Sequence, residues 1–182
     1  MSIFEFILIP FGLVVAFAVS ELMSSWARIL RDRASWTNPG LYLSFSIWLV
    51  LNLFGHFAGL WSYRDLAFST GTAILTLMPA FLFALAMTLF ALDPRSEDRD
   101  LAAAYERVIR PVALLVAAGL FLSTATDLLP GVAETPPFVV MGAQLLLMLI
   151  LAFASSRRVH VGAHVALWVG NLTFPLFAYN PL

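Results

Sequence analysis

Hydrophobic residues fill six long segments of the chain, separated by short polar stretches. The segments lie at about 3–27, 41–61, 71–92, 110–130, 137–155 and 159–178. Each holds about 18–25 residues, enough for a helix rising 1.5 Å per residue to cross an apolar layer of about 30 Å. Because lipid offers the backbone no hydrogen-bond partners, such segments must be helical. The pattern therefore predicts an all-α bundle of about six transmembrane helices.

The breaks between the segments are short and rich in helix-ending residues. Proline or glycine stands at 38–40, 93–94 and 131–137, where these residues interrupt helices or turn the chain. Only the stretch 96–110 has enough charge to form a short amphipathic helix on the cytoplasmic side. It either lies at the membrane interface or runs straight into the fourth segment, with Pro111 kinking the junction. Short loops leave no room for a soluble domain, so we expect residues 1–182 to form one integral membrane domain.

Arginine is distributed very unevenly between the breaks. The chain has 10 basic residues and no lysine, and only Arg64 follows an even-numbered segment. The other nine follow the first, third and fifth segments: Arg28, Arg31, Arg33, Arg95, Arg99, Arg107, Arg110, Arg157 and Arg158. Basic residues are retained on the cytoplasmic side of membranes. We therefore expect those three breaks to be cytoplasmic and both termini to lie on the other side.

Composition supports the membrane interpretation and argues against several classes of function. The chain is 61% hydrophobic and 12% charged, against about 45–50% and about 25% in soluble domains. A net charge of −1 gives no reason to expect a nucleic-acid partner. Without cysteine there are no disulfides, thiolate metal sites or cysteine nucleophiles. Arginine without lysine is typical of a GC-rich genome. We expect the chain to lie in a bacterial cytoplasmic (inner) membrane. Its expected partners are the lipid bilayer and either further copies of itself, in a homo-oligomer, or the subunits of a larger membrane complex.

Polar residues in the cytoplasmic half form one candidate network. They are Glu21, Ser24, Ser25 and Arg28 on the first segment, and His160, His164 and Asn171 on the sixth. The spacings i, i+3, i+4 and i+7 place each group on one helix face. Polar groups at membrane depth mark either a pathway or hydrogen bonds between helices. We expect Glu21 to face His164 across the interface of these two segments.

The histidine pair raises the question of a metal or haem. Histidines at i and i+4 can share a metal ion, but zinc takes three or four ligands, and Glu21 is the one candidate for the third. No H-E-x-x-H sequence is present. No cofactor is therefore predicted, and haem or metal at His160 and His164 stays open.

A second group of polar residues is expected in the outer half. It comprises Glu5, Asn52, His56 and Asp127. Asn52 and His56 are four residues apart and share a helix face. We expect His56 and Asp127 to lie on adjacent helices and to face protein rather than lipid.

Three functions fit these features. The first is a transporter or channel for a small solute or ion that uses the polar stripes on segments one, two and six. The second is an accessory or scaffolding subunit of a larger membrane complex. The third is a membrane enzyme or a haem- or quinone-binding protein. No motif assigns a catalytic residue, so the balance lies against an enzyme.

The arginine asymmetry makes the topology testable. Reporter fusions at Asn38, Asp98 and Ser156 should report a cytoplasmic location, and fusions at Tyr63 and Ala133 the opposite side. A fusion after Leu182 should also report the non-cytoplasmic side. A cytoplasmic signal from that last fusion would contradict the six-segment topology.

Overall fold

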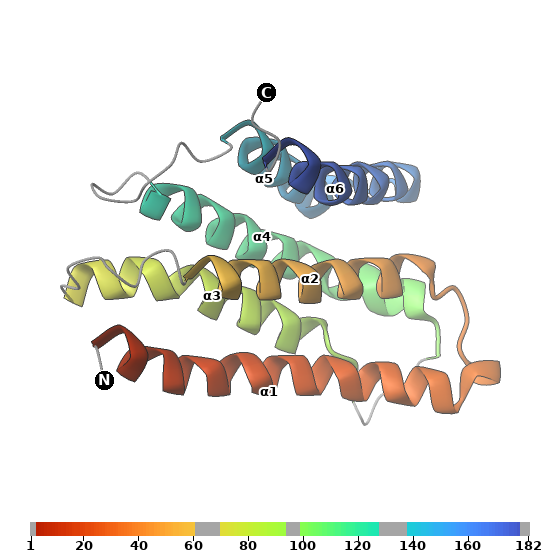
Figure 1. Ribbon diagram of the computed structural model, residues 1–182. Coiled ribbons are helices and arrows are strands. Elements are labelled where there is room, and N and C mark those ends of the chain that lie inside the picture. Colours follow the sequence, from red (N-terminus) through yellow and green to blue (C-terminus); the bar gives the residue numbers. More distant parts are fainter. Residues whose placement is uncertain (1–2, 61–69, 94–98, 128–137, 179–182) are drawn as a thin grey trace.

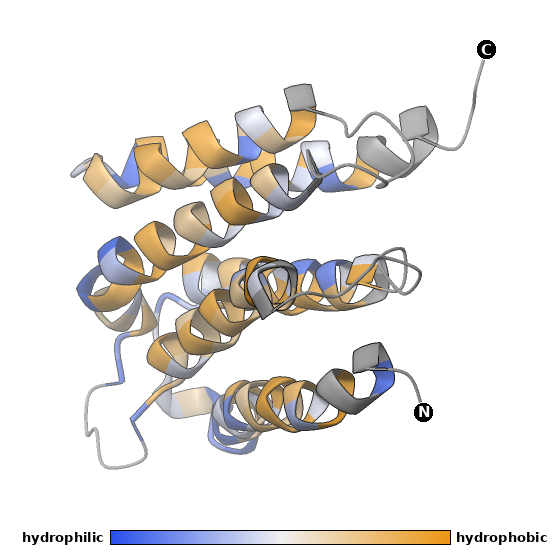
Figure 2. Ribbon diagram, turned by 90° about the vertical axis from the view of Figure 1, so that its left-hand side faces the viewer, coloured by the Kyte–Doolittle hydropathy of each residue, from blue (hydrophilic) through white to orange (hydrophobic). Residues whose placement is uncertain are grey.

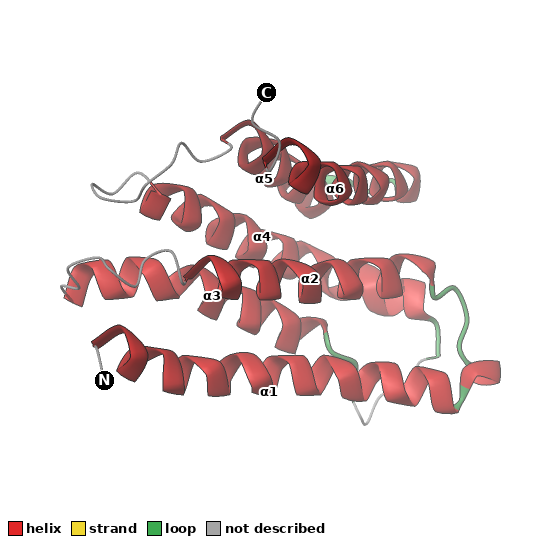
Figure 3. Ribbon diagram, in the orientation of Figure 1, coloured by secondary structure: helices red, strands yellow, loops and turns green. Residues whose placement is uncertain are grey.

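The computed structural model describes residues 3–60, 70–93, 99–127 and 138–178, without the side chains of some helix-end residues such as Asp127. The described residues form six α-helices and one 3-10 turn, with no strand among them (Figure 3). The elements are α1 (Ile3–Arg31), η1 (Arg33–Ser35), α2 (Gly40–Gly59), α3 (Thr70–Phe90), α4 (Leu101–Asp127), α5 (Phe138–Phe153) and α6 (Arg157–Ala178). The predicted all-α class is confirmed.

Four of the helices in the described ranges are long and apolar enough to cross a membrane. The qualifying stretches are Leu8–Arg31, Gly40–Phe57, Ala73–Phe90 and Leu101–Thr126. The apolar part of α5, Val140–Phe153, is shorter. By length and composition the chain therefore has the helices of a membrane protein, and hydrophobic residues predominate along them in Figure 2.

Helix α4 follows one of the two alternatives predicted for the charged stretch 96–110. From Leu101 onward the stretch continues into the fourth apolar segment as one helix. Asp100 caps its start, because the Asp100 Oδ1 atom accepts a hydrogen bond from the Ala102 amide at 3.0 Å. Pro111 lies inside α4 but is exposed, so its ring does not push against a neighbouring helix.

The helices pack in an order that places α3 and α4 in the centre. α1 lies at one edge of the bundle against α3, and the α5–α6 hairpin lies at the opposite edge against α4 and α2 (Figure 1). The α3–α4 contact depends on Gly119. A Cβ atom there would lie 3.1 Å from the Phe83 ring and 3.2 Å from the Pro79 carbonyl oxygen, so even alanine would require these neighbours to shift by a few tenths of an ångström.

The outer surface of the bundle is strongly apolar. Leu13 is 69% exposed, Leu30 74% and Leu172 67%. Soluble proteins rarely expose wide continuous apolar areas, whereas lipid accepts them.

The core contains an aromatic cluster in which Tyr42 stacks on Phe90 with ring centroids 4.8 Å apart.

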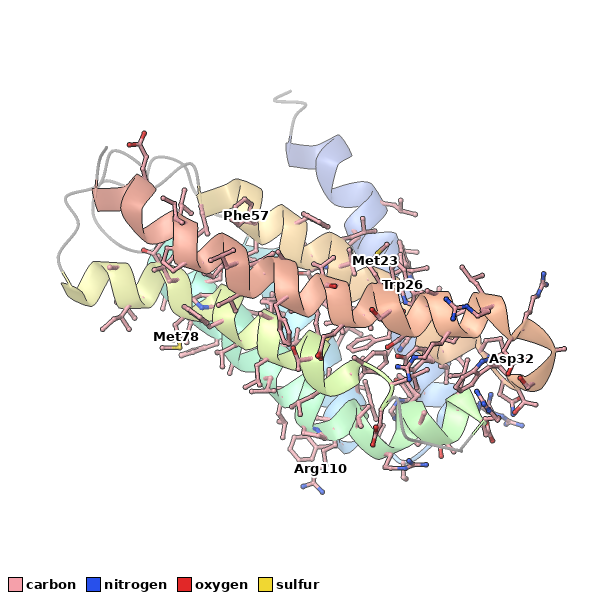
Figure 4. The ribbon with its side chains drawn as sticks, turned by 90° about the horizontal axis from the view of Figure 1, so that it is seen from below. Met23, Trp26, Asp32, Phe57, Met78 and Arg110 are labelled. Carbon is pink, nitrogen blue, oxygen red and sulfur yellow. The ribbon has the colours of Figure 1, made fainter. Side chains whose placement is uncertain are left out.

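Charged residues gather at one end of the bundle, around the loop between α1 and α2. Figure 4 shows Asp32 there among side chains tipped with nitrogen and oxygen, with Phe57 and Met78 toward the other end. The Thr37 backbone pairs with the start of α4 through the Arg99 carbonyl, at 3.0 Å. Arg99 also lies 3.8 Å from the Asp32 carboxylate. These contacts join the loop after α1 to the loop before α4, both of which were predicted to be cytoplasmic.

Candidate functional site

Five side chains from three helices form a continuous hydrogen-bonded chain, which we call the polar brace. It consists of Ser44 on α2, Tyr105 on α4, and His160, His164 and Trp168 on α6. The Tyr105 hydroxyl lies 2.7 Å from the Nδ1 atom of His160 and 3.1 Å from the Nε2 atom of His164. Both histidines and Tyr105 are buried. The brace thus ties α6 to α2 and α4 at its centre.

The partners at the two ends fix the direction of every bond in the brace. The His160 Nε2 atom lies 2.9 Å from the Ala154 carbonyl, which can only accept, so Nε2 carries the proton and Nδ1 accepts from Tyr105. Tyr105 must then accept from His164 Nε2. The His164 Nδ1 atom in turn accepts from the Ser44 hydroxyl at 3.3 Å. Ser44 accepts from the Trp168 indole at 2.9 Å.

In this bond order the brace has no free ring nitrogen that could take up a proton. It begins at an indole that can only donate and ends at a carbonyl that can only accept, and both ring nitrogens of each histidine are engaged. A proton could enter only after a ring had turned away from its partner. A metal ion or haem at His160 and His164 would likewise have to replace at least one of these bonds.

Beside the brace lies a cavity of about 480 Å³, which we call the central cavity. All helices except α1 contribute to it. The lining residues are Leu51, Asn52, Gly55, His56, Phe83, Leu120, Ser123, Val140, Met141, Gln144, Trp168, Asn171 and Leu172. Most of these are apolar, and none of them carries a full charge at neutral pH. A cavity of this size with a few convergent polar groups is typical of a small-molecule site.

The amide groups in the central cavity retain free hydrogen-bonding capacity. The Gln144 Nε2 atom donates to the Asn171 Oδ1 atom at 2.9 Å, and the Asn52 Nδ2 atom donates to the Trp48 carbonyl at 2.9 Å. These bonds leave the amide oxygens of Gln144 and Asn52 as acceptors and the Asn171 amide nitrogen as a donor. The cavity can therefore accept from and donate to an uncharged ligand.

His56 is the least satisfied polar residue of the cavity wall. Its Nε2 atom is buried and has no hydrogen-bond partner within the described part of the chain. Its ring stacks on Phe83 with centroids 6.0 Å apart and an interplanar angle of 19°. A buried polar atom without a partner costs about 1–3 kcal/mol.

The cavity brings together residues that the sequence assigned to different layers. Asn171 was predicted in the cytoplasmic network, but it lies with Asn52 and His56 of the predicted outer group. Glu5 is exposed in the first turn of α1, away from the cavity lining. The side chain of Asp127, and with it the expected approach to His56, lies outside the described residues.

Two polar residues of α1, Ser25 and Arg28, form hydrogen bonds to the chain just beyond α3. The Ser25 hydroxyl accepts a hydrogen bond from the Leu92 amide at 2.9 Å, and Arg28 donates to the Leu92 carbonyl. Both groups just beyond the end of α3 are thereby satisfied, as uncapped helix termini require. Glu21 and Ser24 lie on the outer side of α1, along a surface groove.

The expected Glu21–His164 contact is not formed. Both nitrogens of His164 are engaged by Tyr105 and Ser44, whereas Glu21 lines a groove between α1 and the end of α3. No ion pair joins Glu21 to Arg28 in the described part either. Spacing along a helix predicts which side chains share a face, but not which helix that face meets.

Sequence reasoning missed three of the five brace residues. Ser44, Tyr105 and Trp168 were not among the predicted site residues. The available signal was the apolar spacing of Leu101, Tyr105 and Ile109, which puts Tyr105 on the buried face of a helix.

No family model, curated protein or solved structure matches this chain. What the residues can do chemically therefore follows from the geometry of the cavity and the brace. The cavity offers uncharged hydrogen-bonding groups on apolar walls, and the brace holds three helices together.

Replacing Tyr105 should destabilise the fold more than replacing Tyr42. Tyr105→Phe leaves two buried imidazole nitrogens unpaired, at about 1–3 kcal/mol each. Tyr42→Phe removes one bond, to the Phe90 carbonyl at 3.0 Å, worth about 1 kcal/mol. The midpoints of thermal unfolding in the same detergent measure the difference.

A double variant tests the same network. Tyr105→Phe combined with His164→Ala should lose less stability than the sum of the two single variants, because both remove the same bond. Equal losses for Tyr105→Phe and Tyr42→Phe, or full additivity, would show that the brace does not hold the helices together.

Proposed function

We propose that this chain is a six-span membrane protein that binds a small uncharged solute in the central cavity and transports it across the bilayer. The observation that carries the proposal is the central cavity itself, in which helices from both halves of the chain surround neutral hydrogen-bonding groups. No charged residue is among those that line it. An ion would lack the partners that it needs at this depth.

The two-sided character of α6 supports a sixth span. Its polar residues His160 and His164 face the brace, while Val165 and Leu172 are 59% and 67% exposed. A helix with polar groups toward its neighbours and an apolar outer face suits a bundle in lipid. α5 has 16 residues, which cover about 24 Å at 1.5 Å per residue, and α6 packs beside it.

The lining favours a ligand with a short apolar part and an amide or hydroxyl group. Free oxygens on Asn52 and Gln144 can accept from such a group, and the Asn171 amide can donate to it. Phe83, Trp168 and Leu120 supply apolar contact. Because a neutral ligand loses less hydration than an ion, it can enter an apolar site at moderate cost.

The brace separates the central cavity from a second space at the charged end. This cytoplasmic crevice has a volume of about 300 Å³, and its wall includes Glu106, Arg110 and Arg157. Trp168 lines the central cavity, whereas Tyr105 and His160 line the crevice. In this proposal the brace lies between the two spaces. Passage requires its bonds to break, and the α5–α6 hairpin is the unit whose movement against α2 and α4 would do so.

The path differs from the one expected from the sequence. The stripe on the first span does not contribute to it, because Glu21 and Ser24 line a groove on the outer side of α1. The proposed path uses α2, α4, α5 and α6 instead.

Filling the central cavity tests the proposal. Gly55 lines the cavity, and an added Cβ atom would meet nothing within 4 Å. Gly55→Leu should therefore fold normally and occupy the ligand space. Gly59→Leu is the matched control, since Gly59 is equally open but does not line the cavity.

The readout is solute entry into proteoliposomes, followed by stopped-flow light scattering with propionamide and glycerol as probes. We expect the wild-type chain and Gly59→Leu to speed entry, Gly55→Leu to match protein-free vesicles, and tetramethylammonium to be excluded. No acceleration of any neutral probe, together with stoichiometric co-purification with another membrane protein, would instead favour a scaffolding subunit.

A further inference from the structure

A second site lies on the opposite side of the bundle, along the seam between α1 and α3. Its polar part is a groove of about 570 Å³ whose wall includes Ser20, Glu21, Ser24, Arg28 and Arg31. α1 runs along the edge of the bundle here (Figures 1 and 4). None of these residues lines the central cavity, so the groove is independent of the proposed solute path.

The polar groove continues directly into an apolar one. Phe17 lines both, and beyond it the seam forms a groove of about 590 Å³ between residues such as Val14 on α1 and Met78 and Leu85 on α3. The polar part lies toward the arginine-rich end and the apolar part toward the middle of the helices. This is the order of a lipid headgroup and its acyl chain in the cytoplasmic leaflet.

Two arginines at the polar end have unused donors. Arg31 is exposed and contacts no polar group in the described part of the chain. Arg28 uses its Nη2 atom for Leu92 and Ser25, which leaves the Nη1 and Nε donors of its guanidinium group. Guanidinium groups suit phosphate oxygens in both charge and geometry. Glu21 lies two helical turns deeper than Arg28, about 10 Å along the axis, and does not neutralise the pair.

We propose that this groove binds a glycerophospholipid of the cytoplasmic leaflet. Its phosphate lies between Arg28 and Arg31, its ester carbonyls accept from the hydroxyls of Ser20 and Ser24, and one acyl chain follows the α1–α3 seam beyond Phe17. The inference rests on the membrane orientation in the proposed function, but not on the solute or on transport.

Charge argues for a lipid over a second copy of the chain. Two copies in one membrane share an orientation, so a symmetric contact through α1 would bring Arg28 and Arg31 toward the same residues of the other copy. Like charges placed together cost several kcal/mol at an interface. A lipid phosphate instead supplies the opposite charge.

Native mass spectrometry of the full chain in detergent tests the site. The probes are phosphatidylglycerol and a diacylglycerol with the same acyl chains, with inorganic phosphate as a competitor. We expect the phospholipid to be retained, the diacylglycerol to bind much more weakly, and inorganic phosphate to displace neither. Arg31→Gln should weaken phospholipid binding about five-fold, the effect of one arginine at an anionic membrane surface.

Arg33→Gln is the matched control, because Arg33 lies at the same end, is exposed, and does not line the groove. Glu21→Gln should leave phospholipid binding unchanged or tighter, since the carboxylate does not attract phosphate. Equal effects of Arg31→Gln and Arg33→Gln, equal retention of the diacylglycerol, or loss of binding in Glu21→Gln would each overturn the proposal. A dimer that dissociates in the Phe17→Ser variant would also overturn the proposal, because a second copy of the chain would then cover the groove. Because no solute is involved, failure here leaves the transport proposal standing.

Discussion

Polar groups that are hidden from water must find their partners within the protein, and this constraint organises the whole bundle. The Tyr105 hydroxyl satisfies two imidazoles at once. Ser25 and Arg28 satisfy the backbone beyond α3, and Asp100 satisfies the start of α4. In an apolar solvent each of these groups would otherwise cost several kcal/mol. The helix contacts that they fix, rather than the apolar contacts alone, select one arrangement of helices that are apolar over most of their surface.

The positions of the helices could be predicted closely, because hydropathy and helix-breaking residues act locally. The second segment was expected at about 41–61 and α2 covers Gly40–Gly59. For α4 the sequence left two alternatives, a charged helix at the interface or one that runs into the fourth segment. The structure shows the second, with Asp100 capping the start of the helix and Pro111 inside it. Composition shows that a helix end is charged. Whether the helix continues depends on the neighbours that bury its other face, which in α4 carries the buried residues Tyr105 and Leu101.

The candidate site was less accessible to sequence reasoning, because it depends on which helices are neighbours. Helical spacing placed His160 and His164 on one face, yet it could not show that this face meets Tyr105 and Ser44 rather than Glu21. Asn171 illustrates the same limit, since it belongs to the cavity through its contact with Gln144. Contacts between helices far apart in the chain are set by packing such as the close approach at Gly119, for which a single sequence carries little signal.

The brace also has a consequence for the way the protein is made. α6 carries two arginines, two histidines and an asparagine, so it gains less than the other helices from entering lipid by itself. The groups bonded to its histidines are the hydroxyls of Ser44 and Tyr105 and the Ala154 carbonyl, all of which leave the ribosome earlier. In the proposed six-span arrangement, the last helix would therefore enter the bilayer against helices that are already in place. The α5–α6 hairpin would then be the last part to join the bundle.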